Sequence, residues 1–273
     1  MTNTEEREGM KEDYSNRNTE GSQLMIPGPS TFSAVMDKIA SQCNDELEWV
    51  PFSKDRLTKE AAQVLIEQWS NFTRHSRQCW AHVVGNCPIV EVRKFIVAEN
   101  LYEEEAQEGH SHFDILARMG MAMGLTRDEI ENAAPLPTTV VAMRAWEALT
   151  KNRSWHEGLA AKLVLERTND PNCGNFSHDQ AERWMRQLKL TKEDTEFWWM
   201  HDSVDQIHGD GSLKLLEKYL KTDDEKKAAL AAAEESMMAW KVYFDGIYHE
   251  GRKRSSGYTG RLARVFKSFK WFQ

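Results

Sequence analysis

The chain has 273 residues, of which 40% are hydrophobic and 29% charged, so it can bury a sizeable core in one large domain or two small ones. Its net charge of −8 at pH 7 argues against nucleic-acid binding, which needs a basic face for phosphate contacts. No apolar run is long enough for stable membrane insertion, and the polar N-terminus lacks a signal-peptide core, so we predict a cytoplasmic protein.

Residues 1–24 are polar and charged and are predicted to form a disordered N-terminal arm. A helical domain is expected over residues 25–250, because strand signals are few and capping boxes recur. The capping boxes pair Thr126 with Glu129, Ser154 with Glu157, Ser177 with Gln180 and Thr222 with Glu225. The predicted helices lie near 31–43, 58–84, 88–107, 111–124, 127–134, 138–150, 155–169, 178–189, 192–208, 212–220 and 223–248. An all-α bundle follows.

Residues 251–273 form a basic, amphipathic C-terminal tail with apolar residues at near-helical spacing. Two interpretations are open. The tail is either a terminal helix that docks on the bundle or a segment that binds an anionic surface or a partner.

The stretch "FWWMHDSVDQIHGDG" places His201, Asp205 and His208 on one face of a helix, because they are four and three residues apart. Two imidazoles and a carboxylate suit iron, manganese or zinc. The alternative is a solvated polar face. The aromatic residues at 197–199 favour burial, and buried polar groups need hydrogen bonds or a metal.

Two other segments offer similar groups. Three consecutive acids at 103–105 precede His110 and His112 between two apolar stretches, so one carboxylate and one imidazole could point inward. Glu166 ends an apolar helical segment, either as an ion-pair partner of Arg167 or as a bridging metal ligand. Together these groups suit a two-metal site. The chain contains no Glu-x-x-His, which disfavours a ferritin-like bundle.

These segments resemble a known family. "NLYEEEAQEGHSHFDILARMGMAMGL", "LTKEAAQVLIEQWSNFTRHSRQCWAHVVGNCP" and "YFDGIY" are similar to heme-oxygenase-like di-iron oxidases and oxygenases, relatives of TenA and PqqC that include CADD and UndA. The resemblance covers roughly residues 55–250. It implies a heme-oxygenase-like (TenA/PqqC-like) helical bundle, two Fe(II) ions, O2 as co-substrate, a homodimer, and a reductant or redox partner.

Carried over residue by residue, the resemblance implies a ligand set drawn from several helices. The segment at 103–105 has one extra residue relative to the family pattern, so Glu105 is an alternative to Glu104. Glu67 is a candidate for an additional carboxylate ligand. The implied ligands are Glu104, His112, Glu166, His201, Asp205 and His208.

The implied function is oxidation of a small molecule, most commonly an amino acid or a derivative in a biosynthetic pathway, by N-oxygenation, desaturation or C–C cleavage. The alternatives are a fatty-acid-cleaving di-iron oxidase, a TenA/PqqC-like enzyme without metal, and an interaction protein. If the substrate carries a carboxylate, arginine is the natural clamp. The candidates are Arg93, Arg144, Arg153 and Arg167, although ion pairs elsewhere are the commoner role.

Overall fold

The computed structural model describes residues 31–45, 51–102 and 110–257. The chain divides into two compact units, Met1–Thr31 and Phe32–Gln273, and the helices below belong to the second. Every regular element in its described residues is helical, which confirms the predicted all-α class. The elements are α1 (Phe32–Asp45), α2 (Pro51–Lys54), α3 (Lys59–Asn86), α4 (Val90–Phe95), the π-helix η1 (Ile96–Leu101), α6 (His112–Ala122), α7 (Arg127–Glu131), α8 (Pro137–Lys151), α9 (Trp155–Arg167), α10 (Phe176–Leu188), α11 (Glu196–Tyr219) and α12 (Asp223–Ser255).

Three of the four predicted capping boxes are present, at Thr126, Ser154 and Thr222. The prediction for Ser177 is wrong. The chain enters α10 through Asn175 in a left-handed conformation (φ 59°), so the helix begins at Phe176 and Ser177 lies inside it. The backbone N–H that the first turn leaves free is satisfied from elsewhere, by a side chain of the preceding loop.

The predicted break between residues 208 and 212 is also wrong, because α11 continues through both glycines of this segment. A Cβ on Gly209 would lie 3.2 Å from Cδ of Arg167, and one on Gly211 would overlap the ring of Phe95. These glycines therefore let α9 and α4 pack closely against α11 instead of ending the helix.

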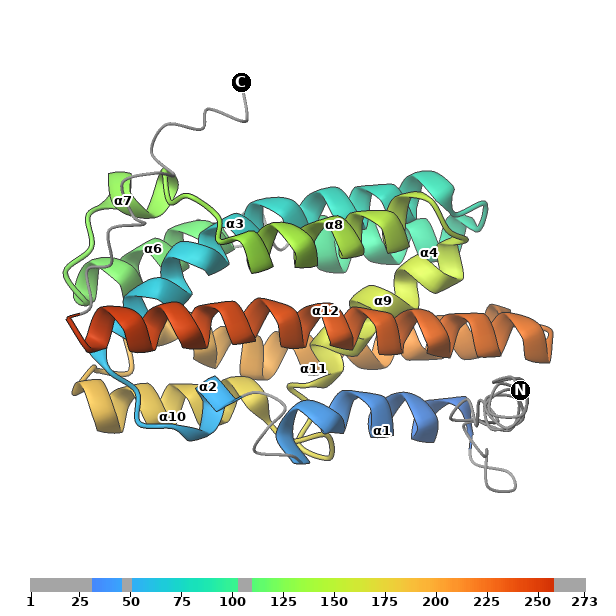
Figure 1. Ribbon diagram of the computed structural model, residues 1–273. Helices are drawn as coiled ribbons and strands as arrows, with labels where there is room; N and C mark the ends of the chain where they lie inside the picture. The colour runs from blue at the N-terminus through green and yellow to red at the C-terminus, as the bar shows by residue number, and fades with distance from the viewer. Residues whose placement is uncertain (1–30, 46–50, 103–109, 258–273) are drawn as a thin grey trace, which may run out of the picture. The chain divides into compact units, whose positions relative to one another are not determined.

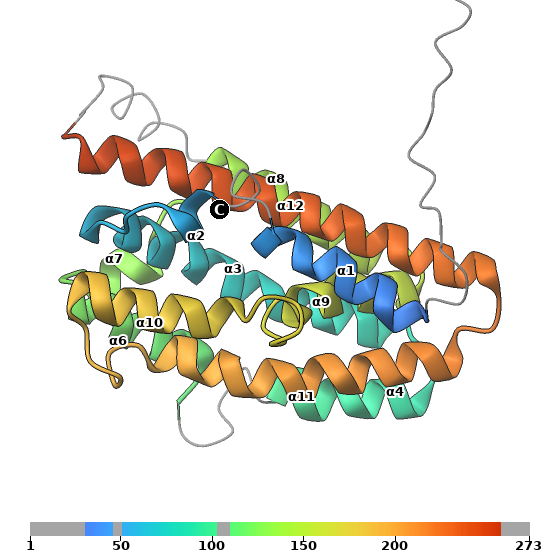
Figure 2. The same ribbon diagram turned by 90° about the horizontal axis from the view of Figure 1, so that it is seen from below.

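The central helix is α9, whose residues Gly158–Leu165 are all buried. It packs against α3, α8, α11 and α12, and α12 also runs beside α3 and α8 (Figure 1). On the other side, α10 and α11 lie next to one another (Figure 2). Because α9 is surrounded, any polar side chain on its inner face points into the protein interior.

An aromatic cluster centred on Trp69 of α3 fixes the start of α11. The Trp69 ring meets the rings of Phe197, Trp198 and Trp240 edge-on, with centroid distances of 5.8, 5.3 and 5.5 Å. Phe197 and Trp198 are each only 1% exposed, as expected for a helix that enters the core. The residues that follow on α11 are thereby directed inward.

The ends of the chain extend beyond the described residues. The predicted arm, 1–24, and residues 258–273 of the predicted tail lie outside them, while α12 continues to Ser255, past residue 250. The domain boundaries therefore stay predictions. Within the residues that the structure describes, no helix is both long enough and apolar enough to cross a bilayer.

Candidate metal centre

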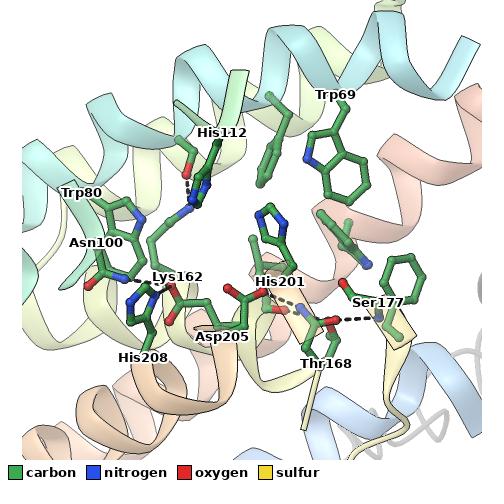
Figure 3. Close-up of a pocket in the computed structure, with 17 residues that line it drawn as sticks. Trp69, Trp80, Asn100, His112, Lys162, Thr168, Ser177, His201, Asp205 and His208 are labelled. Carbon is green, nitrogen blue, oxygen red and sulfur yellow. Dashed lines mark hydrogen bonds and ion pairs between the residues drawn. The ribbon is translucent and has the colours of Figure 1, made fainter. Parts of the chain in front are cut away.

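A cavity lies among α3, η1, α6, α9, α10, α11 and α12 (Figure 3). One part of its lining is polar and comprises Asn100, His112, Lys162, Glu166, Asn169, His201, Asp205 and His208. The other part is aromatic and comprises Trp69, Phe72, Trp80, Phe176 and Trp240. The cavity thus combines groups that bind cations with a surface that suits an apolar molecule.

The α11 face supplies His201, Asp205 and His208, and all three line the cavity, as their spacing predicts (Figure 3). The Nδ1 atom of His201 lies 2.7 Å from the carbonyl oxygen of Phe197, one turn earlier. Because a carbonyl only accepts, Nδ1 carries a proton, and in the neutral imidazole the lone pair is then on Nε2. This is the usual arrangement of a metal-binding imidazole.

Glu166 reaches the cavity from the end of α9, where an asparagine holds it. The amide nitrogen of Asn100 donates to Oε1 of Glu166 at 2.9 Å. Asn100 is 2% exposed and lies within η1, a π-helical turn of the kind that is frequent at functional sites. A neutral amide orients this carboxylate without cancelling its negative charge.

Asp205 is held in a similar way by Asn169, in the loop after α9. The Asn169 amide nitrogen donates to Oδ2 of Asp205 at 2.5 Å, and its carbonyl oxygen accepts the backbone N–H of Ser177 at 2.8 Å. Asn169 is therefore fixed at both ends of its amide group. Asn169 thus links the start of α10 to the carboxylate of Asp205.

His112 enters the cavity at the first residue of α6. The hydroxyl oxygen of Ser111 caps this helix by accepting the backbone N–H of Asp114 at 3.2 Å. The rings of His112 and His201 are 5.0 Å apart between centroids, whereas His110 is exposed. Of the two histidines in this segment, the structure therefore brings His112 to the cavity.

The chemistry of this donor set fits a metal ion. Single ligand atoms of Glu166, Asp205 and His208 all lie within 4.8 Å of one another. Burial lowers the pKa of both His112 and His208 to about 4, and for His208 the neighbouring histidines add to the effect. Both imidazoles are therefore neutral at pH 7 and can offer a nitrogen lone pair to a cation.

Some of the other residues named from the sequence lie outside the described residues, and the rest lie away from the cavity. Glu104 and Glu105 lie outside the described residues. Glu67 pairs with Arg254 of α12 at 2.7 Å and does not line the cavity, so the expectation of an additional ligand there is not met. Glu166 lines the cavity, whereas its neighbour Arg167 pairs with Asp37 and does not line it.

The four arginines considered as a carboxylate clamp all have partners away from the cavity. Arg167 is 5% exposed in its side chain and pairs with Asp37 of α1, Asp170 and Asp210 at 2.7, 3.1 and 2.7 Å. The remaining three bind the carbonyl of Cys87 (Arg93), Glu147 (Arg144) and Glu235 (Arg153). Arginine therefore contributes no charge to the described lining of the cavity.

Among the polar lining residues that sequence reasoning missed are Asn100, Asn169 and Lys162. The two asparagines give no local signal, because their partners are 66 and 36 residues away. Lys162 does give one. It is the only charged residue between Gly158 and Leu165 and stands four residues before Glu166, so both side chains share a face of α9.

The comparisons with known proteins identify the family of the chain. A family model described as iron-containing redox enzyme matches residues 63–241, more than half of the chain. No curated protein matches.

Solved structures with a related fold include a domain of unknown function with a heme oxygenase-like fold from Shewanella denitrificans. It has a TM-score of 0.66 and 17% identity, over 84% of this chain and 93% of that one. A CADD-like protein of unknown function from Nostoc punctiforme has a TM-score of 0.64 and 15% identity, over 81% of this chain and 98% of that one. These similarities confirm the predicted heme-oxygenase-like fold, and the family match shows that the chain belongs to the iron-containing redox enzymes.

Proposed function

We propose that this protein is a non-heme di-iron oxidase or oxygenase that uses O2 to oxidise a small organic molecule, an amino acid or amino-acid derivative. The observation that carries the proposal is the convergence of Glu166, Asp205 and His208 in a buried cavity, with ligand atoms within 4.8 Å of one another. Carboxylates and neutral imidazoles together form a donor set that suits iron.

In this proposal Glu166, Asp205 and His208 hold one ion, and His112 and His201 provide the imidazoles beside it. A further carboxylate from Glu104 or Glu105 completes the set that the family resemblance implies. Bound Fe(II) supplies the electrons with which O2 is activated.

The chain itself provides orientation and a dry surrounding. Asn100 and Asn169 fix the directions of the two carboxylates, which keeps their lone pairs pointed at the cavity. The aromatic lining, which includes Trp69, Phe72 and Trp240, excludes water and contacts the apolar part of a substrate.

The test is anaerobic loading with Fe(II), followed by measurement of bound iron and of O2 uptake with a panel of amino acids and fatty acids. We expect about two iron ions per chain by the family resemblance. Glu166→Ala should abolish high-affinity iron binding and O2 uptake while the helical circular dichroism is retained. Glu182→Ala is the matched control, because this glutamate lies on α10 with a 58% exposed side chain.

Two results would contradict the proposal. Wild-type protein that binds no iron would favour a TenA/PqqC-like enzyme without metal, and full turnover by Glu166→Ala would make that glutamate merely structural. O2 uptake with fatty acids alone would support the di-iron centre but show that the substrate is a fatty acid. The homodimer, the reductant and the cytoplasmic location belong to the same proposal and are tested by gel filtration, by electron-donor dependence and by cell fractionation.

A further inference from the structure

Lys162 is a buried cation in the lining of the cavity. It lies on α9, is 4% exposed, and its Nζ atom donates to the hydroxyl oxygen of Ser76 at 2.7 Å. The same atom lies 4.9 Å from the ring of Trp80 and 5.4 Å from the ring of Phe72. Figure 3 shows Lys162 among the side chains that line the cavity, together with His112 and His208.

The surroundings of Lys162 compensate its charge only in part. A buried ammonium is costly unless it is paired, and it has three donors to satisfy. Within the described part of the chain, its hydrogen-bond and ring contacts are one neutral hydroxyl and two aromatic faces, with no carboxylate in ion-pair range. The buried Arg167, by contrast, forms ion pairs with three aspartates.

A second buried donor belongs to another residue of the same lining. Trp240 is 3% exposed and lines the cavity, and its indole nitrogen makes no hydrogen bond to any described residue. A buried indole N–H normally has an acceptor. The donor positions that Lys162 has left over favour a ligand that brings acceptor atoms.

We infer that Lys162 binds an anionic group of the substrate, a carboxylate, while the aromatic lining contacts the apolar remainder. The inference rests on the proposed function in taking this cavity as the place where the substrate binds. A carboxylate supplies charge and two acceptor oxygens, and in a desolvated site such charge-assisted bonds are strong.

The position of Lys162 also limits which part of the substrate reacts. It stands four residues before Glu166 on the same face of α9, and four residues of helix span about 6 Å along the axis. A carboxylate bound at Lys162 therefore lies in the same cavity as the proposed metal-binding residues and next to Glu166 along the helix. The oxidised atom lies near the carboxylate of a short acid, and not in the middle of a long chain.

The experiment compares hexanoate with hexanamide, which have the same chain length and differ in charge. Binding is measured by calorimetry and tryptophan fluorescence on the full chain, stripped of metal with a chelator so that carboxylate–metal bonds cannot contribute. We expect hexanoate to bind wild type at least roughly tenfold more tightly than hexanamide. Lys162→Met, which keeps the apolar stem, should remove this preference and leave hexanamide binding unchanged.

Lys218→Met is the matched control, because Lys218 pairs with Glu91 outside the cavity and its loss removes the same charge from the chain. It should keep the preference for hexanoate. If Lys162→Met does not give a native circular dichroism spectrum, Lys162→Gln takes its place, and the comparison of the two ligands in wild type still decides.

Equal binding of hexanoate and hexanamide to wild type would overturn the inference, and so would a preference that survives in a folded Lys162 variant. The outcome is independent of iron. A retained hexanoate preference in a protein that never binds iron would refute the di-iron proposal and leave the carboxylate site in place. Iron binding and O2 uptake without any hexanoate preference would support the di-iron proposal and refute the carboxylate site at Lys162.

Discussion

Replacing Asn169 by alanine should weaken metal binding although Asn169 is not itself a ligand. Its amide nitrogen holds Oδ2 of Asp205 at 2.5 Å, and its carbonyl oxygen accepts the backbone N–H of Ser177 at 2.8 Å. Truncation removes this hydrogen bond to the carboxylate and leaves a buried N–H without its acceptor. Two separate quantities, metal affinity and the stability of the metal-free fold, should therefore fall.

The magnitudes follow from these two contacts. Loss of an outer partner of a metal ligand typically lowers metal affinity about 10–100-fold, which corresponds to roughly 1.4–2.8 kcal/mol. An unsatisfied buried N–H at Ser177 costs roughly 1–3 kcal/mol of folding stability. We therefore expect Asn169→Ala to shift the Fe(II) titration midpoint by roughly one to two orders of magnitude.

The assay is an anaerobic Fe(II) titration by calorimetry, with urea unfolding of the metal-free protein as the second readout. Asn172→Ala is the matched control, because Asn172 lies in the same loop and is exposed. It should change neither quantity appreciably. Wild-type iron affinity in Asn169→Ala would refute the idea that this amide orients Asp205 for a metal, even if the protein were destabilised.

Two further predictions concern the fold. A Cβ on Gly251 of α12 would lie 2.9 Å from Cα of Ala61. Gly251→Ala should therefore lower the free energy of unfolding by roughly 1–3 kcal/mol, partly offset by the higher helix propensity of alanine. Gly85→Ala is the control, because nothing lies within 4 Å of the added atom, and it should be neutral or stabilising. Thermal unfolding measures both variants, and equal melting temperatures would contradict this prediction. Burial, assisted by the charge of Lys162, lowers the pKa of His75 from 6.5 to about 4. The unfolded chain thus binds more protons between these pH values, and stability falls as pH falls from 6.5 to 4. His75→Gln should remove roughly 1–2 kcal/mol of that loss, allowing for partial exposure, and an unchanged pH dependence in urea titrations would show that His75 is not responsible.

Local sequence signals were sufficient for most of the fold. The capping boxes at Thr126, Ser154 and Thr222 mark real helix starts, because a cap is made by residues adjacent in sequence. The errors arose where distant residues decide. Gly211 looks like an interruption, but the ring of Phe95 from α4 occupies the space that a side chain would need, so the glycine belongs inside α11.

The same distinction applies to the candidate site. His201, Asp205 and His208 could be grouped from their spacing alone, since one helix face is a local property. The partners that orient the carboxylates could not, because Asn100 and Asn169 come from η1 and from a loop. Lys162 is marked by its place in an apolar segment on the same helix face as Glu166, but the absence of a carboxylate partner among the described residues is decided by the helices packed around it.

The ion pairs of Arg167 have a consequence for how this architecture can vary. A proposed metal ligand and a packing residue are consecutive on both helices: Glu166 precedes Arg167 on α9, and His208 precedes Gly209 on α11. Arg167 packs against Gly209 and pairs with Asp210 and with Asp37 of α1, although no described residue of α1 lines the cavity. These contacts lie outside the cavity, and they hold α9 and α11 at a fixed distance from one another. Substitutions that alter cavity size or substrate contacts can accumulate on the inner faces, whereas a change at Asp37 would move both halves of the site at once.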